Sequence, residues 1–483
     1  MKTLLSLIFI FTFSFAVFGA TYTVTRSDDR NGTCNSGVDC SLREAVNAAN
    51  AAPSNDTINF VNSISKITLT SQILISNNGT LAIQGTGANA MAISGDTVTR
   101  IFLTEEAIVT IQDVALINGK AANTTGGGAI YVNGGSLILE RLLFDHNAAG
   151  DNPFVDSEPA GAVFFNGGTH TINNSTISNN KAGSVAGGIF NLATLTITNS
   201  TFSGNSGWYN AGGIYNNGNL NLQNVTITNN IALTRCPSRC SGYGGGIYND
   251  GTLKISNSII AGNISETHGT PDVISPEISF IDGSITSAGN NLIGDSLGDS
   301  TSTIKPITYQ PTDRLDVNPN LGELQNNGGA TPTHALLFGS PAINAGNNSN
   351  VPATDQRGFA RIVGGIIDIG AFEVQSTLPP PQPTNCSYSI TSTTQNFSLS
   401  GGTGTITVTT SDGCAYTAQA SSESTFVTVT NPNGMGNGTI NFTVDANSGA
   451  ARAGTIFVAG YAFNVIQDAA ATRRKKKLLS PTQ

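Results

Sequence analysis

Apolar and polar residues alternate within five copies of one motif between Gly126 and Asn263. Each copy has a glycine-rich start, an apolar-aromatic pair, a turn, and a short alternating run such as TLTIT at residues 194–198. Alternation with a period of two is typical of strands and not of helices. Matching aliphatic residues recur at steps of 33, 26, 25 and 33 residues, at Ile130, Val163, Ile189, Ile214 and Ile247. Because so small a unit cannot bury its own apolar face, the copies must stack, which predicts an all-β chain built on a right-handed parallel β-helix of the pectin-lyase-like type.

Two columns of asparagines recur at fixed positions in these copies. The first contains Asn174, Asn199, Asn224 and Asn257, and the second, six residues later, contains Asn180, Asn205, Asn230 and Asn263, with Asn147 joining it. An amide side chain both donates and accepts hydrogen bonds, and asparagine tolerates left-handed backbone at a bend. Amides stacked coil over coil would satisfy the backbone of the turns. We therefore expect both columns to be structural ladders.

Composition and charge exclude one class of partner. Only 11% of the residues are charged, 55 of 483 are glycine, and the net charge is −9, despite a basic run at residues 473–477. An acidic body argues against nucleic acid as a partner. Residues 1–20 have an apolar core followed by small residues, which predicts a secretory signal peptide that is too short to span a membrane. The expected location is extracellular or at the cell surface.

Six cysteines form three pairs that are close in sequence: Cys34 with Cys40, Cys236 with Cys240, and Cys386 with Cys414. Disulfides are the expected state in an exported chain. Histidines are scattered, which argues against a metal site. The cluster Asp28, Asp29, Asn31 and Gly32 could hold calcium but lacks the bidentate glutamate of a calcium loop, so a polar turn is favoured and no cofactor is expected.

A short helix is predicted close to the first cysteine pair. Ser41 with Glu44 makes a capping box, and an apolar stripe follows at Leu42, Ala45, Val46 and Ala49. Such a helix would cover the open end of the solenoid, here assigned to residues 21–55. The sequence CSLREAV at 40–46 resembles the CSLREA family of exported bacterial proteins, and residues 56–289 fit the coils that follow in such proteins.

Residues 290–373 resemble the choice-of-anchor Q domain in the segments NPNLGELQNNGGATPTHALLFGSPAINAG and TDQRGFARIVGGIIDIGAFE, with Asn344 where aspartate is expected. The resemblance implies an exported surface protein and supplies no reaction. We expect this segment to form the terminal coils. Asp355, Arg357 and Asp368 lie among glycines and apolar residues, which favours a buried ion pair over a catalytic group.

A Pro-rich linker at 374–385 is followed by evenly spaced alternating runs at 386–467 and a basic tail at 468–483. The alternating runs predict an immunoglobulin-like β-sandwich. This region resembles a BACON domain in its cysteine arrangement and in the GGTGTITVTT and GMGNGTINFTVDAN strands. The resemblance implies contact with carbohydrate. Tyr416 and Phe426 stand where tryptophan is expected and could stack on a sugar, although packing in the core is favoured.

A catalytic function would need acidic and basic groups on adjacent coils. The candidates surround the first insertion: Asp145, His146, Asp151, Asp156, Glu158 and His170. The following copies hold serine, asparagine and glycine at the places of Asp145 and His146, which argues against an active site. A polysaccharide lyase or hydrolase therefore remains the alternative function.

The favoured function is adhesion or glycan binding without catalysis. The GGAI and FxxN segments resemble the repeats of polymorphic outer membrane adhesins, and the insertions at 151–158 and 235–243 are predicted to project from one side and form a contact surface. Trp208 and Tyr209 are further candidates for sugar stacking. The expected partner is an extracellular glycan or another cell-surface component, and a purely structural spacer is a second alternative.

Overall fold

The computed structural model describes residues 19–76, 79–121, 125–150, 159–233, 244–266, 277–279, 283–296, 307–337, 339–375, 386–411, 414–421, 424–459 and 461–469. The chain forms two compact units that divide after Ser376, within the Pro-rich segment. Each unit has a hydrophobic core of its own. No helix among these residues is long and apolar enough to cross a membrane.

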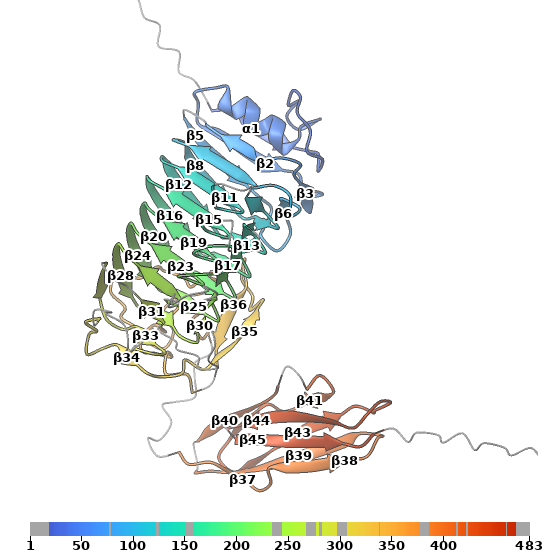
Figure 1. Cartoon of the computed structure of the whole chain (residues 1–483). Coiled ribbons are helices and arrows are strands. Elements are labelled where there is room, and N and C mark those ends of the chain that lie inside the picture. Colours follow the sequence, from blue (N-terminus) through green and yellow to red (C-terminus); the bar gives the residue numbers. More distant parts are fainter. Residues whose placement is uncertain are drawn as a thin grey trace, which may run out of the picture. The chain divides into compact units, whose positions relative to one another are not determined.

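The first unit is the predicted parallel β-helix, and its coils are built from four parallel sheets (Figure 1). The long sheet contains β1 (Thr21–Val24), β2 (Asp56–Phe60), β5 (Thr80–Gln84), β8 (Ile108–Gln112), β12 (Ser136–Glu140), β16 (Thr169–Asn173), β20 (Thr194–Thr198), β24 (Asn219–Gln223), β28 (Thr252–Ser256) and β32 (Ser284–Ser287). The aromatic sheet contains β4 (Ile73–Ile75), β7 (Phe102–Glu105), β11 (Ile130–Asn133), β15 (Val163–Asn166), β19 (Ile189–Asn191), β23 (Ile214–Asn216), β27 (Ile247–Asn249) and β31 (Ile278–Ser279).

The other two sheets complete each coil. The covered sheet contains β3 (Lys66–Thr68), β6 (Ala92–Ser94), β9 (Ala115–Ile117), β13 (Leu143–Asp145), β17 (Thr176–Ser178), β21 (Thr201–Ser203), β25 (Thr226–Thr228), β29 (Ile259–Ile260), β33 (Leu292–Ile293) and β34 (Arg314–Leu315). The short sheet contains β10 (Lys120–Ala121), β14 (Ala148–Ala149), β18 (Lys181–Ala182), β22 (Ser206–Gly207), β26 (Ile231–Leu233) and β30 (Ile264–Glu266).

The strand register follows the sequence repeat. Ile130, Val163, Ile189, Ile214 and Ile247 pair in succession across the aromatic sheet, and all five are fully buried. Inward residues of the long, aromatic and covered sheets contribute to one continuous core. Stacking therefore buries the apolar face that a single coil would leave exposed.

The second asparagine column forms the predicted ladder. The side-chain amide of each member donates to the carbonyl oxygen of the next, from Asn147 to Asn180, Asn205, Asn230 and Asn263, at 2.8 to 2.9 Å. Each of those carbonyl oxygens also accepts the backbone N–H of the previous member. Because all five residues are buried, these bonds satisfy groups that would otherwise be costly to bury.

The ladder ends on a group that the sequence repeat did not reveal. Asn263 Nδ2 donates to Glu277 Oε2 at 2.6 Å, and the backbone N–H groups of Gly262 and Asn263 donate to the same carboxylate. A carboxylate suits this place because it accepts hydrogen bonds and has none to donate. Burial raises the pKa of Glu277 to about 7, against the opposing effect of these donors.

The first asparagine column does not form a ladder, and that expectation is wrong. Asn174, Asn199, Asn224 and Asn257 all adopt left-handed backbone with φ between 48° and 54°, which explains why asparagine recurs there. Only Asn199 donates to a neighbour in the column, Asn174, at 3.2 Å. The side-chain amide of Asn224 is buried without a partner. The column therefore shapes a bend, and its amides serve other contacts.

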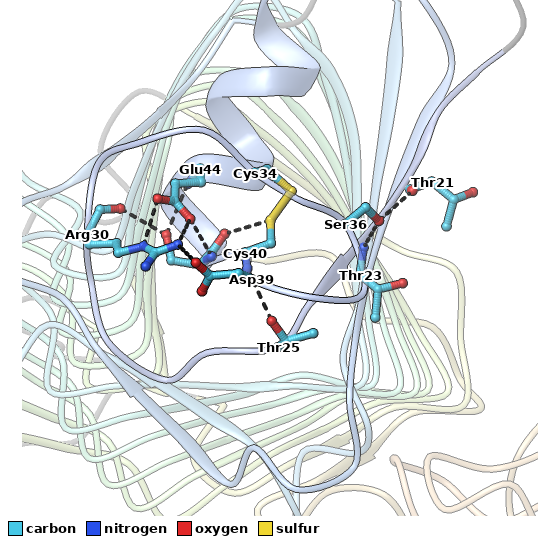
Figure 2. The surroundings of a disulfide bond; sticks show 10 residues. Thr21, Thr23, Thr25, Arg30, Cys34, Ser36, Asp39, Cys40 and Glu44 are labelled. Atoms are coloured by element: carbon cyan, nitrogen blue, oxygen red, sulfur yellow. Dashed lines mark hydrogen bonds and ion pairs between the residues drawn. A yellow bond between two sulfur atoms is a disulfide. The ribbon is translucent and has the colours of Figure 1, made fainter.

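The N-terminal cap is built as predicted. Helix α1 (Leu42–Asn50) begins with the Ser41–Glu44 capping box and buries its apolar stripe against β1, β2 and β4. A disulfide joins Cys34 and Cys40, and Arg30 bridges Asp39 and Glu44 beside it (Figure 2).

Arginine side chains satisfy the two carboxylates once considered for calcium. Asp28 pairs with Arg26 at 2.7 Å, and Asp29 pairs with Arg43 at 2.7 Å while also accepting from Thr70. Both carboxylates are therefore engaged by arginine side chains.

Residues 290–373 were expected to form terminal coils, and this holds for β33 and β34, which continue the covered sheet. The expectation is wrong for residues 326–337 and 339–375, which we call the strap. After β34, the chain forms the antiparallel hairpin β35 (Leu321–Gln325) and β36 (Thr333–Leu336) and then returns along the outside of the covered sheet (Figure 1). Outward hydroxyl groups of that sheet bind it: Thr176 donates to Pro332, Thr201 to Gln356, and Thr226 accepts from Ala371. Apolar residues hold the strap there as well, since Ile259 and Leu292 of the covered sheet share a buried cluster with Ile369.

The second unit is the predicted sandwich. One sheet contains β37 (Ser389–Ile390), β39 (Gly402–Thr409), β43 (Gly438–Val444) and β41 (Val427–Val429), and the other contains β38 (Thr394–Phe397), β45 (Tyr461–Gln467), β44 (Arg452–Val458), β40 (Ala415–Ala420) and β42 (Asn433–Met435). A disulfide joins Cys386 and Cys414, as expected. Cys236 and Cys240 lie outside the described residues.

Candidate functional site

Of the residues predicted for catalysis that the structure describes, Asp145 and His146 contact each other, and His170 contacts neither of them. Asp145, at the end of β13, contacts the His146 ring at 2.6 Å and accepts hydrogen bonds from Ser178 and Asn179. The His146 side chain is 63% exposed, on a turn with left-handed backbone. Asp151, Asp156 and Glu158 lie outside the described residues.

The His170 side chain lies in the core of the β-helix, so the prediction that His170 is a catalytic group is wrong. It is 1% exposed, pairs in register with Leu137 and Leu195, and stacks on Phe165 with ring centroids 4.7 Å apart. Its Nδ1 accepts the Leu137 N–H, and its Nε2 lies 2.6 Å from the Gly167 carbonyl oxygen. These contacts define a neutral ring, and burial lowers the pKa of His170.

Acidification is expected to destabilise the fold through His170. Its pKa is lowered in the folded state, so the unfolded chain binds the proton more readily, and stability is lost as pH falls through the unfolded value near 6.5. The free energy of unfolding is measured with denaturant at pH 7.5 and at pH 5. Between these values it should fall by roughly 1 kcal/mol more in the wild type than in His170→Gln. His146→Gln is the control. Equal losses in wild type and His170→Gln would contradict this account.

The aromatic residues proposed for sugar stacking are not open platforms. Tyr416 and Phe426 are 2% and 7% exposed in the sandwich core, and the Arg452 guanidinium covers the Phe426 ring at 4.1 Å. Their alternative role in packing is therefore the one the fold uses. Trp208 and Tyr209 are half-buried in the turn before β23, where their backbone N–H groups donate to Ser184.

The charged residues of the strap form the predicted buried ion pair. Arg357 contacts Asp355 at 2.7 Å, and neither side chain is more than 6% exposed. Asp355 also accepts backbone N–H groups of Arg357, Phe359 and Glu373. Burial raises the pKa of Glu373 to about 8. These groups hold the strap together.

A row of aromatic rings follows the outer face of the aromatic sheet, which the sequence analysis missed. Successive ring centroids are 4.8 to 5.0 Å apart, in the order Tyr131, Phe164, Phe190, Tyr215 and Tyr248. The rings stack on or point edgewise at one another, so their faces are used within the row. This row stabilises coil stacking. The apolar-aromatic pair of each motif copy is the pattern that could have revealed it.

A cavity of about 500 Å³ lies beside the end of the asparagine ladder. Its lining includes Asn229, Glu277, Glu323 and His334. Glu277 accepts the hydrogen bonds that end the ladder. The His334 ring contacts the Gly322 carbonyl oxygen and the Ser203 hydroxyl, and burial lowers the pKa of His334. The lining groups nearest the ladder are therefore engaged in the fold.

The long sheet carries an open set of polar groups that we call the polar grid. It consists of the outward side chains of three adjacent strands: Thr169 and Thr171 on β16, Thr194 and Thr196 on β20, and Asn219 and Asn221 on β24. All six are exposed or half-buried, and none makes a side-chain hydrogen bond among the described residues. Strand geometry spaces them by about 4.8 Å across strands and about 6.7 Å along them.

The residues beside the grid determine how much charge this surface carries. On one side Ile138 is 40% exposed and Ile108 51% exposed, and on the other Lys254 follows Asn221 in register. At the C-terminal end of β12, Glu140 accepts hydrogen bonds from Arg141 and Asn174. The grid is therefore an uncharged surface that can both donate and accept hydrogen bonds.

Comparisons with known proteins identify no relative by sequence. No protein-family model matches the chain, and no curated protein matches it. Among solved structures, pectate lyase Pel9A is 17% identical with a TM-score of 0.45, covering 74% of this chain and 97% of its own. A Bacteroides ovatus GH5 xyloglucanase in complex with a XXXG heptasaccharide is 19% identical with a TM-score of 0.16, covering 20% of this chain and 21% of its own. Likeness at this level does not extend to function, which has to follow from the surface of this chain.

Proposed function

We propose that the protein is an exported, non-catalytic glycan-binding protein whose β-helix contacts neutral polysaccharide through the polar grid. The observation that carries the proposal is the set of six hydroxyl and amide side chains held in register without partners. Sugar hydroxyls donate and accept hydrogen bonds, as these side chains do. Export follows from the predicted signal peptide at 1–20, of which residues 1–18 lie outside the described residues.

The covered sheet supports this use of an outward hydroxyl face. Its Thr176, Thr201 and Thr226 occupy outward positions comparable to those of the grid and bind uncharged groups of the strap, which are the Pro332 carbonyl oxygen, the Gln356 side-chain amide and the Ala371 N–H. The grid offers the same type of group with no strap upon it. A polymer rich in uncharged hydrogen-bonding groups is therefore a fitting occupant.

Charge selects neutral polymers over acidic ones. The chain has a net charge of −9, and Lys254 is the basic residue that flanks the grid. An anionic polysaccharide would be repelled by the acidic body and would meet no basic cluster among the described residues of this face. Neutral chains carry no such penalty.

A binding panel tests this proposal. The full chain should be retained by insoluble neutral polysaccharides and pass over acidic ones at 0.15 M salt, with no release of reducing ends or unsaturated sugars. Retention by acidic polymers alone would contradict the neutral class. Product release that disappears in Asp145→Asn with His146→Gln would instead identify an enzyme that uses the 2.6 Å pair on the β13 turn.

A further inference from the structure

Two isoleucines lie on the outer face of the long sheet beside the polar grid, on the adjacent strands β8 and β12 (Figure 1). Ile108 is the first residue of β8 and is 51% exposed, and Ile138 is the middle residue of β12 and is 40% exposed. Ile138 pairs in register with Thr171 of the grid, and Ile108 pairs with Ser136, two residues before Ile138. The two isoleucines are therefore diagonal neighbours, roughly 8 Å apart, and form one apolar step that continues the grid.

Each isoleucine of the apolar step has a hydroxyl group on either side of it across the strands. These flanking residues are Thr80 and Ser136 for Ile108, and Thr110 and Thr171 for Ile138. None of the four hydroxyls makes a side-chain hydrogen bond among the described residues. Neighbouring strands lie about 4.8 Å apart, so each hydroxyl is close to its isoleucine. The step therefore offers apolar surface and hydroxyl donors side by side.

The charge closest to the apolar step is already paired. Glu140, two residues beyond Ile138 on the same face of β12, accepts hydrogen bonds from Arg141 and Asn174. Its partner in register on β8 is the uncharged Gln112. A ligand on the step therefore needs no charge of its own, which agrees with the neutral class of polymer proposed above.

We infer that the apolar step binds the O-acetyl groups of a neutral polysaccharide that lies on the grid. An acetyl ester has a methyl group next to a carbonyl oxygen, which accepts hydrogen bonds, and it has no donor. Its methyl group would pack on Ile108 or Ile138, and a flanking hydroxyl would donate to its carbonyl oxygen. The inference rests on the proposed function and narrows the class of ligand for that same surface.

The flanking hydroxyls favour an ester over the other apolar parts of a sugar polymer. The C–H face of an unsubstituted sugar ring has no carbonyl oxygen, so the hydroxyls would gain no strong acceptor from it. An acetamido group adds an N–H donor, and the groups in register with the isoleucines include no amide or carboxylate to accept from it. A methyl group with an acceptor beside it is therefore the closest match to the step.

A polymer laid across the strands would meet both isoleucines before it reaches the grid. The strands β8 and β12 precede the grid strands β16, β20 and β24 in the long sheet, at successive steps of about 4.8 Å. Burial of one methyl group is worth roughly a fourfold gain in affinity, so acetyl groups on both isoleucines should give about tenfold or more.

Depletion isotherms of the full chain on one bead-immobilised neutral polysaccharide, in two forms, test the apolar step. The O-acetylated polymer should bind about tenfold more tightly than the same polymer after alkaline removal of its acetyl groups. Ile108→Thr with Ile138→Thr keeps β-branched side chains on the strands and should abolish that preference, while binding to the deacetylated form stays within about twofold. Leu74→Thr with Val98→Thr is the matched control and should keep the preference, because both residues are exposed and lie outside the long sheet.

The outcomes separate this inference from the proposed function. Equal binding of the two forms by the wild type would overturn the apolar step while the proposed function stands, and this comparison needs no variant. A preference for the acetylated form that survives in the isoleucine variant would also overturn the step. Tighter binding to chitin, which carries N-acetyl groups, would assign the step to acetamido groups and overturn the ester. Binding to none of these polymers would overturn the inference and the proposed function together.

Discussion

Asn205→Leu is expected to lower the free energy of unfolding of the β-helix by about 3 kcal/mol. Asn205 is fully buried at the middle of the ladder. Its removal leaves the backbone N–H and side-chain amide of Asn180 without an acceptor and the Ile177 carbonyl oxygen without its donor. Buried groups left unpaired cost about 1 to 3 kcal/mol each, and leucine supplies no hydrogen bond in return.

Urea denaturation followed by circular dichroism measures this loss. Asn221→Ala is the matched control, because Asn221 lies on the outer face of the neighbouring sheet and makes no side-chain hydrogen bond among the described residues. The control should change stability by less than about 0.5 kcal/mol. If Asn205→Leu resembled the control, the ladder would not be a main source of stability.

Asp355→Ala is expected to release the strap from the covered sheet. Asp355 is the partner of the buried Arg357, so its loss leaves a guanidinium 6% exposed and uncompensated, at a cost of about 3 to 5 kcal/mol. Three backbone N–H groups of the strap lose their acceptor as well. Because the strap lies outside the core of the helix, it should open before the coils unfold.

Hydrogen exchange resolves that order of events. Amides of residues 339–375 should lose protection by at least about a hundredfold in Asp355→Ala, while those of β16, β20 and β24 change little. Glu323→Ala is the control, because Glu323 is an exposed acidic residue on the β35 strand that precedes the strap. Unchanged protection of the strap would show that the ion pair does not hold it.

The coils could be predicted because apolar and polar residues alternate, and because the place of each residue in its copy determines which residues pair. Each aliphatic residue from Ile130 to Ile247 stands at the same place in its copy, and stacking requires these residues to pair. The capping box of α1 was equally predictable, since Ser41 and Glu44 are local partners. His170 could have been placed in the core by the same phase comparison, because Leu195 and Leu220 follow it in register.

The same comparison could not predict that the strap lies on the covered sheet, or that the grid side chains have no hydrogen-bond partners among the described residues. Thr176 on the covered sheet and Thr171 on the long sheet belong to similar alternating runs, and the pattern does not say which outer face the chain will later cover. That depends on contacts across about 155 residues, such as Thr201 with Gln356. Glu277 was missed for a related reason, since it ends the ladder after an interruption of the repeat.

The most direct test of the central claim places charge and bulk on the grid. Thr171→Lys with Thr196→Lys changes outward side chains and should leave the fold intact. Thr405→Lys with Thr407→Lys on β39 is the matched control, because both threonines are exposed on another face. In depletion isotherms on a neutral polysaccharide, we expect the grid variant to bind at least about tenfold more weakly than wild type and the control to match wild type. Equal binding by the grid variant and the control would contradict the account.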